Sequence, residues 1–171
     1  FAMNKANTVT GTQALNNVTF LTSNGQNDCI IASGTTLTVN GTLTFDGTTD
    51  ENDTLNGPGG ISAKGDISVV GYGLYGSVPN NPGTVLITIN GTGNQTITGE
   101  NDDNSQIPGI NIDKPSGTLS LVSKFLIGGA GGLTYTRGTV DPGTSTVEIT
   151  VSVLQIAGSL KLNNIIFLTE S

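Results

Sequence analysis

The chain has 171 residues, a formal net charge of −7 and no histidine, and only six of its residues are Lys or Arg. It therefore offers no basic surface to neutralise phosphates, which excludes nucleic acid as an expected partner, and no imidazole for catalysis or metal binding. Charged residues make up only 11% of the chain and short apolar runs recur throughout, so the chain does not have the composition typical of disordered segments.

The N-terminal segment, residues 1–13, mixes polar and apolar residues without helical spacing. We expect a single domain over residues 1–171, in which residues 1–13 form an extended arm or a donor strand. The sequence begins with Phe1, which fits a mature product after removal of a secretion signal, so we expect an extracellular or cell-surface location. No apolar run approaches the roughly 20 residues of a transmembrane helix, so no transmembrane segment is expected.

After this segment, short runs with alternating apolar residues follow one another at nearly even spacing. In the first part of the chain they occupy residues 17–22, 29–33, 36–41, 42–47, 60–65, 66–71, 84–91 and 95–99. In the second part they occupy residues 109–117, 118–123, 124–129, 132–138, 139–145, 146–153, 154–158 and 159–169. The 26 Thr, 25 Gly and 18 Asn favour strands and tight turns over helices, so the sequence predicts an all-β fold.

Most of the runs end at residues that favour turns. Asn-Gly pairs begin at Asn40 and Asn90, and Asn-Gly is the strongest short turn signal. Pro-Gly pairs follow at Pro58, Pro82, Pro108 and Pro142, where proline interrupts a strand and glycine accepts the next backbone conformation. These positions are expected to be corners between strands.

Two architectures are compatible with many short strands at steady intervals: a β-solenoid of stacked strands, or an antiparallel β-sandwich or jelly roll. Three features favour the solenoid. Blocks of strand, Gly-Thr and strand recur, as in "LTVNGTLTFDGT" and "ITINGTGNQTITG". Thr and Asn can stack on like residues, with Asn amides forming ladders at turns, and the chain has no Trp and few other aromatic residues to fill a wide core.

The segment "INIDKPSGTLSLVSKFLIGGAGGLTYTRGTVDPGTSTVEIT", with "GSLKLNNIIF" after it, resembles the Thr/Gly/Asn-rich strand repeats of large secreted bacterial surface and adhesin-like proteins. The resemblance covers roughly residues 110–167, with a weaker echo over residues 36–99. It implies a secreted module of stacked strands and names no activity.

The stretch "LNNVTFLT" at residues 15–22 returns as "LNNIIFLT" at residues 162–169. If both ends of the chain are similar, unfinished strand surfaces, one copy can pair with the next and form a linear head-to-tail polymer, by stacking or by strand donation. The simpler alternative is two duplicated strands within a monomer. The expected assembly interface consists of Leu15, Val18, Phe20, Leu21, Leu162, Ile165, Ile166, Phe167 and Leu168.

The leading functional hypothesis is a non-enzymatic structural subunit of an extracellular filament. The alternative is a surface adhesin or carbohydrate-binding module in which Tyr72 and Tyr75 of "GYGLYG", or Tyr135, stack on sugar rings, although these rings are more simply explained by packing on the core. A polysaccharide-degrading β-helix enzyme comes third, because the chain has one Arg and no His.

Acidic residues gather in two polar turns: Asp46, Asp50 and Asp53, and then Glu100, Asp102 and Asp103. Solvated loop carboxylates are the ordinary interpretation. A weak Ca²⁺ site is the alternative, because calcium prefers such oxygen ligands, although neither turn matches an EF-hand. Glu148 is expected to face outward from its strand, and Cys29, the only cysteine, is expected to be buried.

Overall fold

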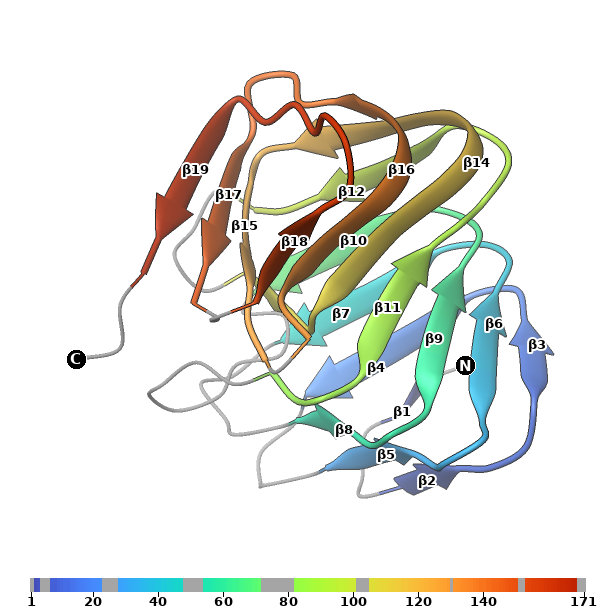
Figure 1. Cartoon of the computed structure of the whole chain (residues 1–171). Helices are drawn as coiled ribbons and strands as arrows, with labels where there is room; N and C mark the ends of the chain where they lie inside the picture. The colour runs from blue at the N-terminus through green and yellow to red at the C-terminus, as the bar shows by residue number, and fades with distance from the viewer. Residues whose placement is uncertain are drawn as a thin grey trace.

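The structure is a computed structural model, and it describes residues 2–3, 7–22, 28–47, 54–71, 82–100, 105–129, 131–150 and 153–168. Every regular element in these ranges is a β-strand, and every strand pairing is parallel. The chain winds into stacked coils that progress from the N-terminal to the C-terminal end of the molecule (Figure 1). This confirms the predicted β-solenoid, since the strands of a sandwich or jelly roll would pair antiparallel.

The strands stack on three faces, which we number 1 to 3 in the order in which the chain crosses them. Face 1 contains β1 (Ala2–Met3), β4 (Val18–Thr22), β7 (Leu43–Gly47), β10 (Ile67–Gly71), β12 (Gln95–Thr98) and the second parts of β14 (Ile110–Val122) and β16 (Leu133–Asp141). Face 2 contains β2 (Asn7–Val9), β5 (Cys29–Ile31) and β8 (Leu55–Asn56), and further along the stack β13 (Gln106–Ile107), β15 (Lys124–Ile127), β17 (Thr146–Ile149) and β19 (Asn164–Phe167). Face 3 contains β3 (Gln13–Leu15), β6 (Thr36–Val39), β9 (Gly60–Ala63), β11 (Leu86–Ile89), the first parts of β14 and β16, and β18 (Leu154–Ile156).

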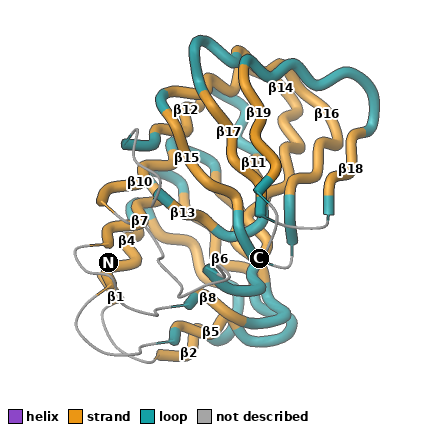
Figure 2. The backbone as a smooth tube through the Cα atoms, turned by 90° about the vertical axis from the view of Figure 1, so that its left-hand side faces the viewer, coloured by secondary structure: helices purple, strands orange, loops and turns teal. Residues whose placement is uncertain are grey.

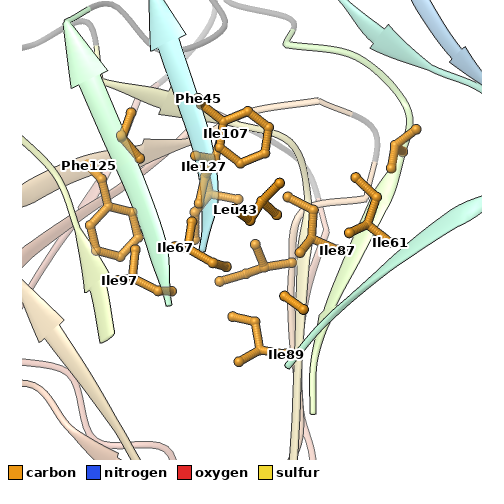
Figure 3. Close-up of a cluster of buried hydrophobic side chains, with 14 of the residues drawn as sticks. Leu43, Phe45, Ile61, Ile67, Ile87, Ile89, Ile97, Ile107, Phe125 and Ile127 are labelled. Carbon is orange, nitrogen blue, oxygen red and sulfur yellow. The ribbon is translucent and has the colours of Figure 1, made fainter. Parts of the chain in front are cut away.

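The core fills the interior of the coil, between the three faces. On β7, for example, Leu43 and Phe45 are buried while Thr44 between them is half-buried, as expected for a strand with one inward side. Branched aliphatic side chains and phenylalanines from all three faces point toward one another inside the coil (Figure 3). The rings of Phe20 and Phe45, from neighbouring coils, stack at a centroid distance of 5.6 Å. A coil with neighbours on both sides therefore buries its apolar residues against the coils above and below it.

The predicted turn residues lie between strands, as expected. Asn40 separates β6 from β7, and Asn90 separates β11 from β12. The Pro-Gly pairs that begin at Pro58, Pro108 and Pro142 also fall between successive strands. Because the flanking strands lie on different faces, these residues form corners of the coil and not hairpins.

Asparagine and aspartate side chains at the corner between faces 3 and 1 hold neighbouring coils together. Each accepts a hydrogen bond from a backbone N–H of the following coil. The bonds run from Thr42 to Oδ1 of Asn17 (2.8 Å), from Thr96 to Oδ1 of Asp66 (2.8 Å) and from Thr118 to Oδ1 of Asn94 (3.0 Å). At this corner the described bonds therefore run from side chain to backbone, in place of the expected ladder between asparagine amides.

Strand β14 differs from the sequence expectation, which ended one run at Gly117 and began the next at Thr118. The strand continues through Pro115 and rounds a corner, so its first part lies on face 3 and its second part on face 1. The pairing with β16 shifts register on either side of Asp113, and Lys114 turns inward and is buried. Proline is tolerated here because the chain is bulged at this position.

The described part of the N-terminal segment pairs with its own chain. There β1 pairs with β4 and β2 pairs with β5, so these strands belong to the first coil. Donation of residues 1–13 to a second copy stays a prediction. Backbone pairing in this segment was not visible in its sequence because its apolar residues do not alternate.

Candidate functional site

The most distinctive surface of the molecule lies at the C-terminal end of the stack, on β18, β19 and the residue after β19. We define the C-terminal end surface as Leu154, Ile156, Ile165, Ile166, Phe167 and Leu168, each of which is between 38% and 58% exposed. Strand β18 lies beside β16 and strand β19 lies beside β17, and both are at the same end of the molecule (Figures 1 and 2). A group of large apolar side chains at one end of a stack is a candidate contact surface.

Two residues of β19, Ile165 and Phe167, are exposed although they occupy inward positions, because no described strand stacks on them. Phe167 is in register with Ile149, which is in register with Ile127 on the coil before. Ile127 and Ile149 are at most 1% exposed, whereas Phe167 is 58% exposed. Ile165 likewise follows Val147, with exposures of 38% and 2%. These side chains have the positions of core residues and lack the covering coil.

The same relation holds on face 3. Leu154 is in register with Leu133, and Ile156 is in register with Tyr135. Leu133 and Tyr135 are buried, whereas Leu154 and Ile156 are 39% and 45% exposed. Two of the three faces thus end in strands whose apolar inward side is uncovered.

The strand edges at this end are also open. Among the described strands, β18 pairs only with β16, and β19 pairs only with β17. Their outer edges therefore present backbone donors and acceptors, which favours pairing with a further parallel strand. The C-terminal end surface combines apolar side chains with two open strand edges.

At the N-terminal end of the stack the described strands β2 and β3 also present open edges, and their exposed residues are more polar. In the described residues β2 pairs only with β5, and β3 pairs only with β6. Asn7, Gln13 and Ala14 on these strands are exposed, whereas Val9 and Leu15 are half-buried and pack on the core. The two ends therefore differ in polarity although both are open.

Several residues of the expected assembly interface lie elsewhere. Val18 and Phe20 are buried in the core at 0% and 3% exposure, because β1 pairs with β4 on one side and β7 pairs with it on the other. This corrects their placement at an end of the molecule. Leu21 is half-buried on the same strand, and Leu162 is half-buried and packs against the core.

Of the expected interface residues, Leu15 lies on the edge strand at the N-terminal end, and Ile165, Ile166, Phe167 and Leu168 lie at the C-terminal end. Leu154 and Ile156 also belong to the C-terminal end and were missed from the sequence. Their alternation with Gln155 is that of any half-buried strand, so the local sequence held no signal of exposure.

The two similar segments also do not occupy equivalent positions. The first places β4 on face 1, next to β7, whereas the second places β19 on face 2, next to β17. In the first segment Leu15 ends β3 and Asn16 and Asn17 lie at the corner before β4, whereas in the second Leu162 and Asn163 precede β19 and Asn164 begins it. The repeat therefore does not make the two ends copies of one another.

Of the residues expected to bind calcium, the structure describes Asp46 and Glu100, whereas Asp50, Asp53, Asp102 and Asp103 lie outside the described residues. Asp46 is half-buried on β7, in register with Val70. One carboxylate oxygen of Glu100 accepts a hydrogen bond of 2.7 Å from the backbone N–H of Gly71. Within the described residues, no three acidic, cysteine or histidine side chains form a group that could hold a metal ion.

The tyrosines proposed as a sugar-binding platform are similarly divided, because Tyr72 and Tyr75 lie outside the described residues. Tyr135 is only 6% exposed, and its hydroxyl donates a hydrogen bond of 2.7 Å to the carbonyl of Gly138. Tyr135 is therefore a core residue with a satisfied hydroxyl, which corrects its proposed role in stacking on sugar.

Two other side chains named in the sequence analysis, Glu148 and Cys29, are buried. Glu148 alternates with the core residues Val147 and Ile149, yet it is itself only 6% exposed and lies 3.1 Å from Nζ of Lys124. Cys29 is buried, as predicted, and desolvation raises the pKa of its thiol to about 11. A thiol with this pKa is not poised as a nucleophile near neutral pH.

Comparison of the chain with protein-family models, curated proteins and solved structures gives no match. The described residues contain no helix that is long and apolar enough to span a membrane.

Proposed function

We propose that this protein is the structural subunit of an extracellular filament that assembles head to tail, with the C-terminal end of one copy stacked on the N-terminal end of the next. The observation that carries the proposal is the C-terminal end surface, where large apolar side chains are exposed beside open strand edges. Four of its residues continue columns of buried residues: Leu154, Ile156, Ile165 and Phe167. The polar side chains on the outward side of the strands would remain in contact with solvent along the sides of the filament.

The geometry of the coil favours a filament over a closed ring. All described pairings are parallel and each coil stacks on the next in the same direction, so a second copy added along the stack keeps strand polarity. A contact between two different ends of identical copies is heterologous, and it repeats without limit when the rotation does not close.

The expected affinity follows from the size of the apolar surface. Complete burial of one large aliphatic or aromatic side chain contributes about 1.5–3 kcal/mol, so burying the exposed part of the six end-surface residues gives about 6 kcal/mol. Association costs roughly 4–15 kcal/mol in lost freedom. Strand-edge hydrogen bonds, at about 0.5–1.5 kcal/mol each, then decide the balance. Assembly is therefore expected to rise steeply with protein concentration.

The test is growth of linear polymers by the purified 171-residue chain. Light scattering should show an increase in mass with concentration, and negative-stain electron microscopy should show unbranched filaments. The double variant Ile165→Glu/Phe167→Glu places two charges on the C-terminal end surface and should abolish growth. Circular dichroism and thermal melting establish that this variant is folded.

A matched control carries the same kind of change on a side of the stack. Val122 on β14 is 43% exposed, and β14 is paired on both sides, with β12 and with β16, so Val122→Glu should assemble like the unmodified chain. The proposal fails if the unmodified chain stays monomeric at all concentrations. It also fails if the folded end-surface variant grows as well as the control.

A further inference from the structure

We infer that β3 of one copy pairs with the open edge of β18 of its neighbour, with Leu15 in register with Ile156. This inference rests on the head-to-tail assembly proposed above, and it adds the strand that covers β18 and the register of that pairing. The occupant of the C-terminal end surface is thus the first coil of a second copy of this chain.

The register comes from face 3, where the residue pairing is continuous from one end of the stack to the other. One inward column consists of Leu15, Val39, Ala63, Ile89, Ile112, Tyr135 and Ile156, each in register with the next. The parallel column two residues earlier begins at Gln13 and ends at Leu154. Continuing both columns into a second copy places Leu15 on Ile156 and Gln13 on Leu154.

The outer column of the same face agrees with this register. It consists of Ala14, Thr38, Ser62, Thr88, Asn111, Thr134 and Gln155. Its two terminal residues, Ala14 and Gln155, are both exposed and both small or polar. A shift of the pairing by one residue would instead bring the inward Ile156 opposite the outward Ala14, which leaves Ile156 exposed.

Face 2 supplies a second, independent match. Among the described strands of that face, β2 is the outermost at the N-terminal end and β19 is the outermost at the C-terminal end. Val9 on β2 is half-buried and packs on the core, and Phe167 on β19 continues the inward column of Ile149. Stacking the first coil of one copy on the last coil of the next therefore covers β18 and β19 together. Val9 would then pack over Phe167 on the inward side of face 2.

A disulfide between neighbouring copies tests the register. In the background Cys29→Ala, the double variant Ala14→Cys/Gln155→Cys carries one thiol at each end of the outer column. Paired residues of adjacent strands lie about 4.8 Å apart, within the Cα separation that a disulfide allows. Within one chain the two positions are separated by six strand spacings, roughly 29 Å, so no disulfide can form inside a copy.

The matched control is Ala14→Cys/Thr134→Cys in the same background. Thr134 lies in the same outer column, one coil before Gln155, so its separation from Ala14 of the next copy would be about 9.6 Å. Mild oxidation of assembled protein should give a ladder of covalent multimers for the Gln155 variant and monomers for the Thr134 variant, resolved by non-reducing electrophoresis.

The outcomes separate the register from the assembly itself. Filaments in both variants with no covalent ladder in the Gln155 variant overturn the register and leave head-to-tail assembly standing. Equal ladders in both variants also overturn it, because the cross-linking is then not specific to one pairing. If neither variant nor the unmodified chain forms filaments, the proposed function fails and the register fails with it.

Discussion

The side-chain nitrogen of Lys114 lies 2.8 Å from Oε1 of Gln95, and both side chains are at most 2% exposed. The same nitrogen donates hydrogen bonds of 2.9 Å to the carbonyl oxygens of Gly91 and Gly93. A lysine amine thus fills the inside of the corner between faces 3 and 1, and its described hydrogen-bond partners are neutral oxygens. Desolvation lowers the pKa of Lys114 from its ordinary value of 10.5.

The variant Lys114→Met should lower the free energy of unfolding by about 2 kcal/mol, because it leaves buried oxygen acceptors without their donor. Urea denaturation followed by circular dichroism measures the change. Lys64→Met is the matched control, since Lys64 lies at the same corner on another coil but is exposed, with a bond of 3.4 Å to the carbonyl of Asn90. Equal stability of the two variants would contradict the structural role of Lys114.

The lowered pKa of Lys114 also predicts how the free energy of unfolding depends on pH. Because the folded-state pKa of Lys114 is lowered, the unfolded chain binds its proton more tightly than the folded chain. Stability from this residue therefore rises as pH increases through the folded pKa toward 10.5. The difference in unfolding free energy between the unmodified chain and Lys114→Met should grow over this range. A constant difference would show that the lysine titrates normally.

Cys29 should react slowly in the native protein. Its thiol is buried and its pKa is raised to about 11, so little thiolate is available to a thiol reagent at pH 8. Labelling should become rapid in denaturant. The pKa of Cys29 is raised whereas that of Lys114 is lowered, so the two residues affect stability in opposite directions as pH rises. The stability that the protonated Cys29 thiol contributes is lost as pH rises from 9 through about 11. Rapid labelling of the folded chain would refute the buried environment.

Two glycines at corners should respond differently to alanine. Gly57 has φ of +128°, and an added Cβ would lie 2.1 Å from the carbonyl oxygen of Ile31 on the neighbouring coil. Gly34 has φ of +71° with open space around the added atom. Gly34→Ala should cost about 1–2 kcal/mol, the strain of a left-handed residue. Gly57→Ala should cost clearly more, and thermal melting of both variants compares them directly.

Much of the fold was predictable because it depends on local chemistry. The alternation of apolar residues predicted the strands, and Asn40, Asn90, Pro58 and Pro142 marked corners that the structure contains. The continuation of β14 past Gly117 was not predictable in the same way. It depends on the bulge around Asp113 and on the polar interior that accepts Lys114, and these are formed by residues from other coils.

The candidate site was only partly predictable. Ile165, Ile166 and Phe167 were identified because apolar residues on both sides of a strand require cover. Val18 and Phe20 share the local sequence pattern of the closing segment, yet they are buried because β1 covers one edge of β4 and β7 covers the other. A strand's own residues carry no information about which strands will stack on it.

The sequence by itself determined that this protein is all-β, where most of its strands and corners lie, and that its core is aliphatic. Those properties arise from backbone preferences and side-chain alternation within a few residues. Only the tertiary structure decided that the two similar segments lie on different faces, that the N-terminal residues complete the first coil, and that the last coil leaves its inward side open. The physical reason is that burial in a solenoid is set by the neighbouring coil, which lies far away along the chain.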